Sequence, residues 1–273
     1  MIISHTRKFI FIHPHRCAGT SITNSLLPYL GDDDEVYGCT RSGEALSEKN
    51  RLENIKKYRK EQGDSPWKHS TALFVKAYVG DKIWDEYFKF TFVRSPWDIH
   101  LSNYFWWKNS KTWVGLHAQR EAVAGHAPKD FLHRQEKIKQ MSYPEYIKSD
   151  EIWPHTLIDF TTENRELQAT PADVFGRPDS ISNLRTGLNF IGRCEKIKSD
   201  FSYLCGRINL PNILIGLSNA SRELEGRKHH LDYLDKDEKA KSLLRKKHKF
   251  DIKYFKYNEN FSEYDAKWDF YMN

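Results

Sequence analysis

The chain has few cysteines, no long apolar run and little net charge, and each shortage argues against a class of protein. Its four cysteines are widely spaced and include neither a CxxC pair nor zinc-ligand spacing, so we expect reduced thiols, no metal and a cytoplasmic location. No apolar run approaches the roughly 20 residues needed to span a bilayer, so we expect no transmembrane segment. The net charge of +6, with both signs mixed along the chain, suits an anionic ligand, and we predict no nucleic-acid partner.

The 273 residues are long enough, and at 39% hydrophobic apolar enough, to bury a core without a disulfide or metal staple. Three short runs rich in aromatic and β-branched residues predict strands, and residues with helical periodicity follow each of them. The predicted strands cover residues 9–13, 88–93 and 188–192, and the main predicted helices cover 22–30, 72–79, 82–87, 96–107, 197–208 and 235–257. Pro28 should kink or shorten the first of these helices, and Gly80 should close the second. Strands that alternate with helices indicate an α/β fold with a parallel sheet, which binds ligands at the carboxyl ends of its strands.

The first such strand end reads HPHRCAGTS and resembles a phosphate-binding turn. Backbone N–H groups of Ala18, Gly19 and Thr20 can point inward at a helix start, and the hydroxyls of Thr20 and Ser21 can also donate. The familiar phosphate loop has a lysine just before its final Ser/Thr, and this one does not. The alternative is a simple strand-to-helix turn in which glycine is needed only for steric reasons.

The second strand end reads VRSPWDIHLS. Arg94 closes the strand, and Ser102 lies eight residues further on, about two turns into the predicted helix. An arginine offers a rigid fork for phosphate, and a serine adds one hydrogen bond. Arg94 could instead form a surface ion pair. Taken together, the two strand ends predict a ligand with two separated anionic groups.

These stretches resemble one known family. FIHPHRCAGTSI resembles the 5′-phosphosulfate loop of sulfotransferases that use 3′-phosphoadenosine 5′-phosphosulfate (PAPS), and FKFTFVRSPWDIHLSNYFW resembles their 3′-phosphate motif. Three further stretches are similar to the carbohydrate-type branch of that superfamily: KHSTALFVKAYVG, FIGRCEKIKSDF and DIKYFKY. The resemblance implies a P-loop-like three-layer fold, with a central parallel β-sheet flanked by helices. It also implies a single sulfotransferase domain over residues 1–273, with 108–188 as an acceptor-side insertion that is helical or irregular.

The resemblance implies a role for each matching residue. Arg94 and Ser102 would hold the 3′-phosphate, and His69, between the two motifs, would be the general base. Arg193 would lie near the cofactor beside Glu195, and a late segment with Ser221 and Arg222 would close over the donor. The residues expected around the 5′-phosphosulfate are Arg16, Cys17, Ala18, Gly19, Thr20 and Ser21.

The loop departs from the family pattern where that pattern has a lysine. A gapless alignment gives Arg16 the place of the lysine, whereas a slip of one residue would give it to His15. A guanidinium can donate two charge-assisted hydrogen bonds to an oxygen that gains negative charge, although it does not give up a proton. We therefore expect Arg16 to assist departure of the product electrostatically, with His15 as the rival for that position or as a residue at the acceptor entrance.

The sequence thus predicts transfer of a sulfuryl group from PAPS to a hydroxyl of an acceptor that is a carbohydrate or glycan, with PAP as the product and no metal. One alternative is a non-catalytic protein that binds PAP, PAPS or glycans. Another is an ATP-dependent kinase on a similar scaffold, against which the missing Gly-Lys-Ser/Thr ending argues. The sequence identifies neither the acceptor nor the oligomeric state.

Overall fold

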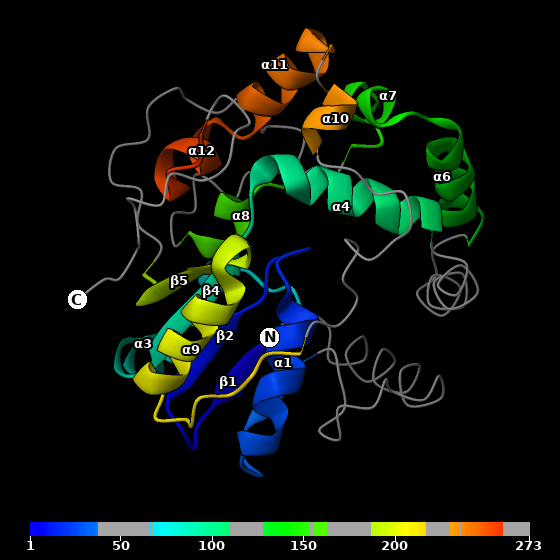
Figure 1. The fold of residues 1–273 in the computed structure, drawn as a ribbon. Coiled ribbons are helices and arrows are strands. Elements are labelled where there is room, and N and C mark those ends of the chain that lie inside the picture. Colours follow the sequence, from blue (N-terminus) through cyan, green and yellow to red (C-terminus); the bar gives the residue numbers. More distant parts are fainter. Residues whose placement is uncertain are drawn as a thin grey trace.

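The strands form a mixed sheet (Figure 1). The computed structural model describes residues 1–37, 66, 68–109, 128–152, 155–162, 187–216, 230–234 and 236–258. Within these ranges the sheet has five strands in the order β3-β1-β2-β4-β5. Their bounds are Ile2–Ser4 for β1, Phe9–Ile12 for β2, Glu35–Val36 for β3, Phe88–Val93 for β4 and Phe190–Arg193 for β5.

The three strands predicted from the sequence are present and parallel. Strand β2 pairs with β4 in parallel, with Phe9 opposite Phe88, and β4 pairs with β5 in parallel, with Phe90 opposite Phe190. The prediction of a wholly parallel sheet was too simple, because β1 pairs antiparallel with both β2 and β3. The parallel part brings the carboxyl ends of β2, β4 and β5 to one edge of the sheet.

Alternation along the strands produces a core on each face of the sheet. Ile10 and Ile12 of β2 belong to a first core, and Phe9 and Phe11 belong to a second core. The first core packs the strands against α3 (Ala72–Glu86), α8 (Leu157–Thr161) and α12 (Lys249–Phe255). The second core packs them against α1 (Gly19–Leu26) and α9 (Ile197–Arg207). A sheet between two helical layers agrees with the predicted three-layer architecture.

Two predicted helix breaks are confirmed. The helix after the first strand stops at Leu26, and a short 3₁₀ turn, Leu27–Tyr29, contains Pro28, which cannot continue an α-helix. Helix α3 changes direction at Gly80, whose φ of 78° is accessible mainly to glycine. The side chain of Thr71 caps α3 by accepting from the N–H of Phe74, and this cap places His69 just before the helix.

A further group of helices covers one end of the sheet, where α4 (Pro96–Asn109) crosses it (Figure 1). The third core joins α4 to α7 (Tyr143–Lys148), α10 (His230–Leu234) and α11 (Glu238–Lys247), and α6 (Pro128–Gln140) also packs on α4. The single helix predicted over 235–257 is two helices, since α11 and α12 meet at His248. Within the described ranges, no helix is both long and apolar enough to cross a membrane.

Candidate active site

The loop between β2 and α1 has the geometry of an anion-binding turn. Arg16 and Ala18 have positive φ values of 64° and 56°, so the loop turns sharply before α1 begins at Gly19. A Cβ at position 19 would lie 1.9 Å from the imidazole of His13, and therefore only glycine fits there. The first turn of α1 has no side-chain cap, so its backbone N–H groups and the positive end of the helix dipole face the loop.

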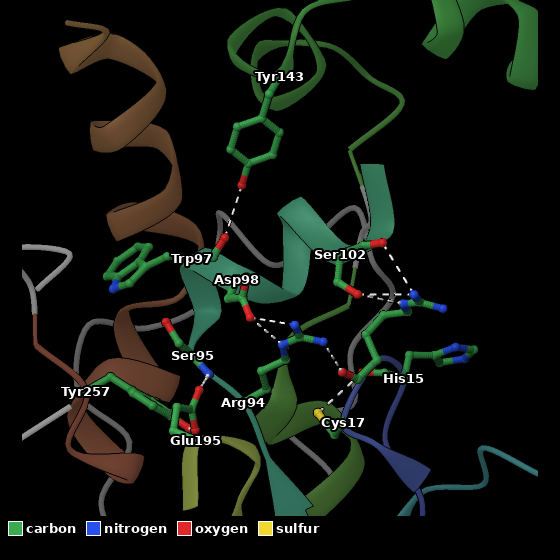
Figure 2. Close-up of polar contacts among 11 residues, drawn as sticks. His15, Cys17, Arg94, Ser95, Trp97, Asp98, Ser102, Tyr143, Glu195 and Tyr257 are labelled. Carbon is green, nitrogen blue, oxygen red and sulfur yellow. Dashed lines mark hydrogen bonds and ion pairs between the residues drawn. The ribbon is translucent and has the colours of Figure 1, made fainter. Parts of the chain in front are cut away.

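Arg94 ties the second strand end to this loop. Figure 2 shows it between Asp98 and the loop that carries His15 and Cys17. Its Nε donates to Asp98 Oδ2 at 2.7 Å, and one terminal nitrogen donates to the backbone oxygen of Arg16 at 3.1 Å. Burial is the largest single influence on Arg94 and lowers its pKa, but the charge and hydrogen bond of Asp98, together with the nearby Cys194 and Glu195, raise the pKa overall. Arg94 is therefore a permanent, partly buried cation, and a guanidinium's five N–H groups leave it donors for a further ligand.

Arg16 and Ser102, one from each predicted motif, are in direct contact. The Nε and a terminal nitrogen of Arg16 donate to Ser102 Oγ at 3.2 and 3.1 Å. Ser102 is buried on α4, and its hydroxyl points toward the loop (Figure 2). The structure thus brings together the residues expected at the two ends of the ligand, and it places the Arg16 guanidinium on α4.

His69 is held in the tautomer that a general base requires. Its Nδ1 lies 2.8 Å from the backbone oxygen of His13, and because a carbonyl only accepts, Nδ1 carries the proton. In the neutral ring, Nε2 then has the lone pair that can take a proton from an acceptor. Burial, and next the neighbouring His15, lower the pKa of His69 well below its usual range. The ring is therefore neutral at physiological pH and able to accept a proton.

The imidazole of His15 stacks against that of His69. The two imidazoles stack with their centroids 3.5 Å apart, and Phe160 of α8 meets His15 edge-on at 5.5 Å. Burial lowers the pKa of His15 to about 3, helped by the nearby His155, Lys68 and Arg16. His15 is thus uncharged, and it positions the ring of His69 between the loop and α8.

Lys68 is a candidate that the sequence analysis missed. Its Nζ lies 3.4 Å from Thr20 Oγ1, at the start of α1 and inside the anion-binding turn. The sequence did contain a signal for Lys68, because it comes immediately before His69. A cation next to a candidate base could bind an anionic donor. The loop, which lacks the usual lysine, thus has a lysine ammonium from another segment.

The remaining predicted residues lie around this centre or outside the described part of the chain. Cys17 is buried behind the loop, where its thiol donates to the backbone oxygen of His15 at 3.4 Å. The guanidinium of Arg193 donates to the backbone oxygen of Phe255 at 2.5 Å and lies over the ring of Tyr257, so its observed contacts are with the C-terminal segment. Ser221 and Arg222 lie outside the described residues.

Two adjacent strand ends with cations, and a neutral imidazole beside the loop of the first, suit an anionic ligand. A model of the sulfotransferase family matches residues 1–258, and the chain therefore belongs to the sulfotransferase family. A search of the curated proteins finds no match. A search of the solved structures finds none either.

Proposed function

We propose that this sulfotransferase moves a sulfuryl group from PAPS to a hydroxyl of a carbohydrate or glycan acceptor, on a P-loop-like scaffold. The observation that carries the proposal is the convergence of His69, Lys68 and Arg94 on the loop before α1. A bisphosphate donor needs two anion sites, and these residues supply one at each of two neighbouring strand ends. The donor set also fits such a ligand, because it combines backbone N–H groups, hydroxyls and two buried or partly buried cations.

In the proposed mechanism, Arg94 and Ser102 bind the 3′-phosphate, and the turn from Cys17 to Ser21 binds the 5′-phosphosulfate. His69 Nε2 takes the proton from the acceptor hydroxyl as the oxygen attacks sulfur. Lys68, through its position at Thr20, stabilises the negative charge that builds up as the S–O bond breaks. Positioning and charge stabilisation carry most of such a transfer, as they do in phosphoryl transfer.

Arg16 would join the two halves of the donor site. Its guanidinium contacts Ser102 while its backbone belongs to the loop, so we expect it to help hold the departing PAP. Lys68 then supplies the second cation, which the loop lysine provides in the family pattern. On this view, neither Arg16 nor His15 has to replace that lysine alone.

The acceptor would enter from the side of α8. The predicted insertion, 108–188, includes α6, α7 and α8, and Phe160 of α8 packs on His15 beside the proposed base. This contact supports an acceptor-side role for the insertion within a single domain over residues 1–273. We keep the cytoplasm as the proposed location, since the cysteines are few and widely spaced.

One observation favours a second candidate, a protein that binds PAP or PAPS without turnover. In this structure the Arg16 guanidinium lies on Ser102, on α4, and a cation held there would bind a donor without assisting bond cleavage.

Thermal stabilisation by PAP, compared with that by ATP and magnesium, tests the donor site, because a ligand stabilises the state to which it binds. We expect PAP to raise the melting temperature and ATP with magnesium to leave it nearly unchanged. The reverse order would reject a PAPS site in favour of the kinase alternative. Stabilisation by PAP without any turnover of PAPS would favour the second candidate.

A further inference from the structure

Three buried polar side chains form a hydrogen-bonded chain away from the candidate site. Asp251 lies on α12, His248 lies between α11 and α12, and His100 lies on α4. His248 Nδ1 is 2.7 Å from Asp251 Oδ2, and His248 Nε2 is 2.6 Å from His100 Nε2. Their exposed fractions are 0%, 1% and 0% for Asp251, His248 and His100. Polar groups this deeply buried are costly unless they are paired, so their geometry calls for an explanation.

Asp251 also holds the start of α8. Its Oδ2 accepts from the backbone N–H of Leu157 at 3.0 Å, and its Oδ1 accepts from that of Ile158 at 2.9 Å. With the N–H of His248, the carboxyl group accepts three hydrogen bonds and acts only as an acceptor. One carboxylate therefore links α8 to the imidazole of His248.

The distances restrict the protons in this chain. Because Asp251 accepts from His248 Nδ1, that nitrogen carries a proton. Only one proton lies between the two Nε2 atoms, because two N–H groups would clash and two lone pairs would repel. Either His100 donates to a neutral His248, or a charged His248 donates to His100. Burial, and next the neighbouring His248 and Lys247, lower the pKa of His100, so His100 is the neutral ring in either arrangement.

The two ends of this chain contact the two helices that border the candidate site. On α4, His100 lies in sequence between Asp98, which accepts a hydrogen bond from Arg94, and Ser102, which accepts hydrogen bonds from Arg16. On α8, Phe160 packs against His15, whose ring stacks on His69. The buried chain thus joins the helix on the donor side to the helix on the acceptor side, and it does so through the C-terminal segment.

Resting on the proposed function, we propose that Asp251, His248 and His100 are positioning residues that hold α4 and α8 in one mutual arrangement. Their contacts keep the bound donor and the base at the separation that transfer requires. Even a displacement of about 1 Å at a reacting centre can lower a rate about 10²-fold. If the three residues only stabilised the fold, their substitution would lower the free energy of unfolding and would have no specific effect on turnover.

Matched variants separate these two roles. His100→Leu removes the link to α4, and His100→Gln restores an N–H donor toward His248. Leu204→Ala, in the second core on the other face of the sheet, serves as a control for lost stability.

At a temperature where all variants are folded, we expect His100→Leu to lower kcat for PAPS turnover by about 10-fold to 10²-fold. We expect His100→Gln to recover most of that loss, and Leu204→Ala to keep kcat within about twofold. Equal kcat and KM in His100→Leu and Leu204→Ala would overturn the proposal. If His100→Leu does not fold, Asp251→Asn is used in its place.

Amide hydrogen exchange gives a readout that does not depend on activity. We expect His100→Leu to accelerate exchange at Leu157 and Ile158, whose N–H groups bind Asp251, and Leu204→Ala to leave it unchanged. Unchanged exchange at these two amides in His100→Leu would overturn the link between the helices. If the wild-type protein transfers no sulfate, the proposed function fails, and the exchange result still decides whether the chain couples α4 to α8.

Discussion

Removal of the Lys68 ammonium is the sharpest perturbation of the proposed mechanism. Its Nζ lies 3.4 Å from Thr20 Oγ1, and we therefore expect it to lie close to the oxygen on which charge develops. A unit charge about 4 Å away is worth about 4 kcal/mol at the effective dielectric of a partly solvated site, or about 10³-fold in rate. Loss of a single transition-state donor in other enzymes costs about 10²-fold to 10³-fold. We predict that Lys68→Met lowers kcat by about 10²-fold to 10³-fold and weakens PAP binding much less.

The same variant should shift the pH profile in a known direction. Burial, then His15 and then Lys68 all lower the pKa of His69, so loss of the Lys68 charge raises it. His69 must be neutral to accept a proton, and its neutral fraction at a given acidic pH falls as its pKa rises. The acid limb of kcat/KM should therefore move to higher pH in Lys68→Met.

Steady-state assays over a range of PAPS concentrations, all in excess of enzyme and repeated across pH, measure both effects. Lys68→Arg keeps the positive charge and should retain much of the rate. Lys137→Met removes a half-exposed lysine that is paired with Glu151 away from the loop, and it should behave as wild type. Turnover by Lys68→Met at the wild-type level, with an unmoved acid limb, would refute the assigned role.

Three further changes test other parts of the site. His69→Ala should lower kcat by about 10²-fold to 10⁴-fold while calorimetry shows that PAP binding is retained, and full activity would exclude the base role. Arg94→Leu removes the cation that pairs with buried Asp98 and should reduce the free energy of unfolding by about 3–5 kcal/mol and abolish PAP binding. A variant that unfolds in denaturant like wild type and still binds PAP would contradict this. Gly19→Ala places a Cβ against the His13 ring, and we expect lower thermal stability with at least tenfold weaker PAP binding, whereas wild-type values would show that the loop tolerates a side chain.

Local sequence signals predicted the parts of the fold that depend on short-range patterns. Aromatic and β-branched runs marked β2, β4 and β5, and Pro28 and Gly80 marked the helix breaks. Strands β1 and β3 have only three and two residues, too few to show a period, so the antiparallel half of the sheet was missed. The break at His248 was also missed, because no proline or glycine marks it.

The candidate site was predictable only in outline. The motif order gave His69, Arg94 and Ser102, and parallel strand ends lie at one edge of a sheet by geometry. The contact of Lys68 with Thr20 and that of Arg16 with Ser102 join residues 48 and 86 positions apart, which no local pattern reveals. In the proposed mechanism, these two contacts divide the role of the missing lysine between two cations.

Transfer of labelled sulfate tests the central claim most directly. The protein is incubated with PAPS labelled at sulfur and a panel of glycans and small alcohols, and label in each acceptor is compared with the PAP formed. We predict label in at least one carbohydrate acceptor, equal in amount to the PAP formed and lost in His69→Ala. No label in any acceptor, with PAPS bound but intact, would contradict sulfuryl transfer and leave a protein that only binds the donor.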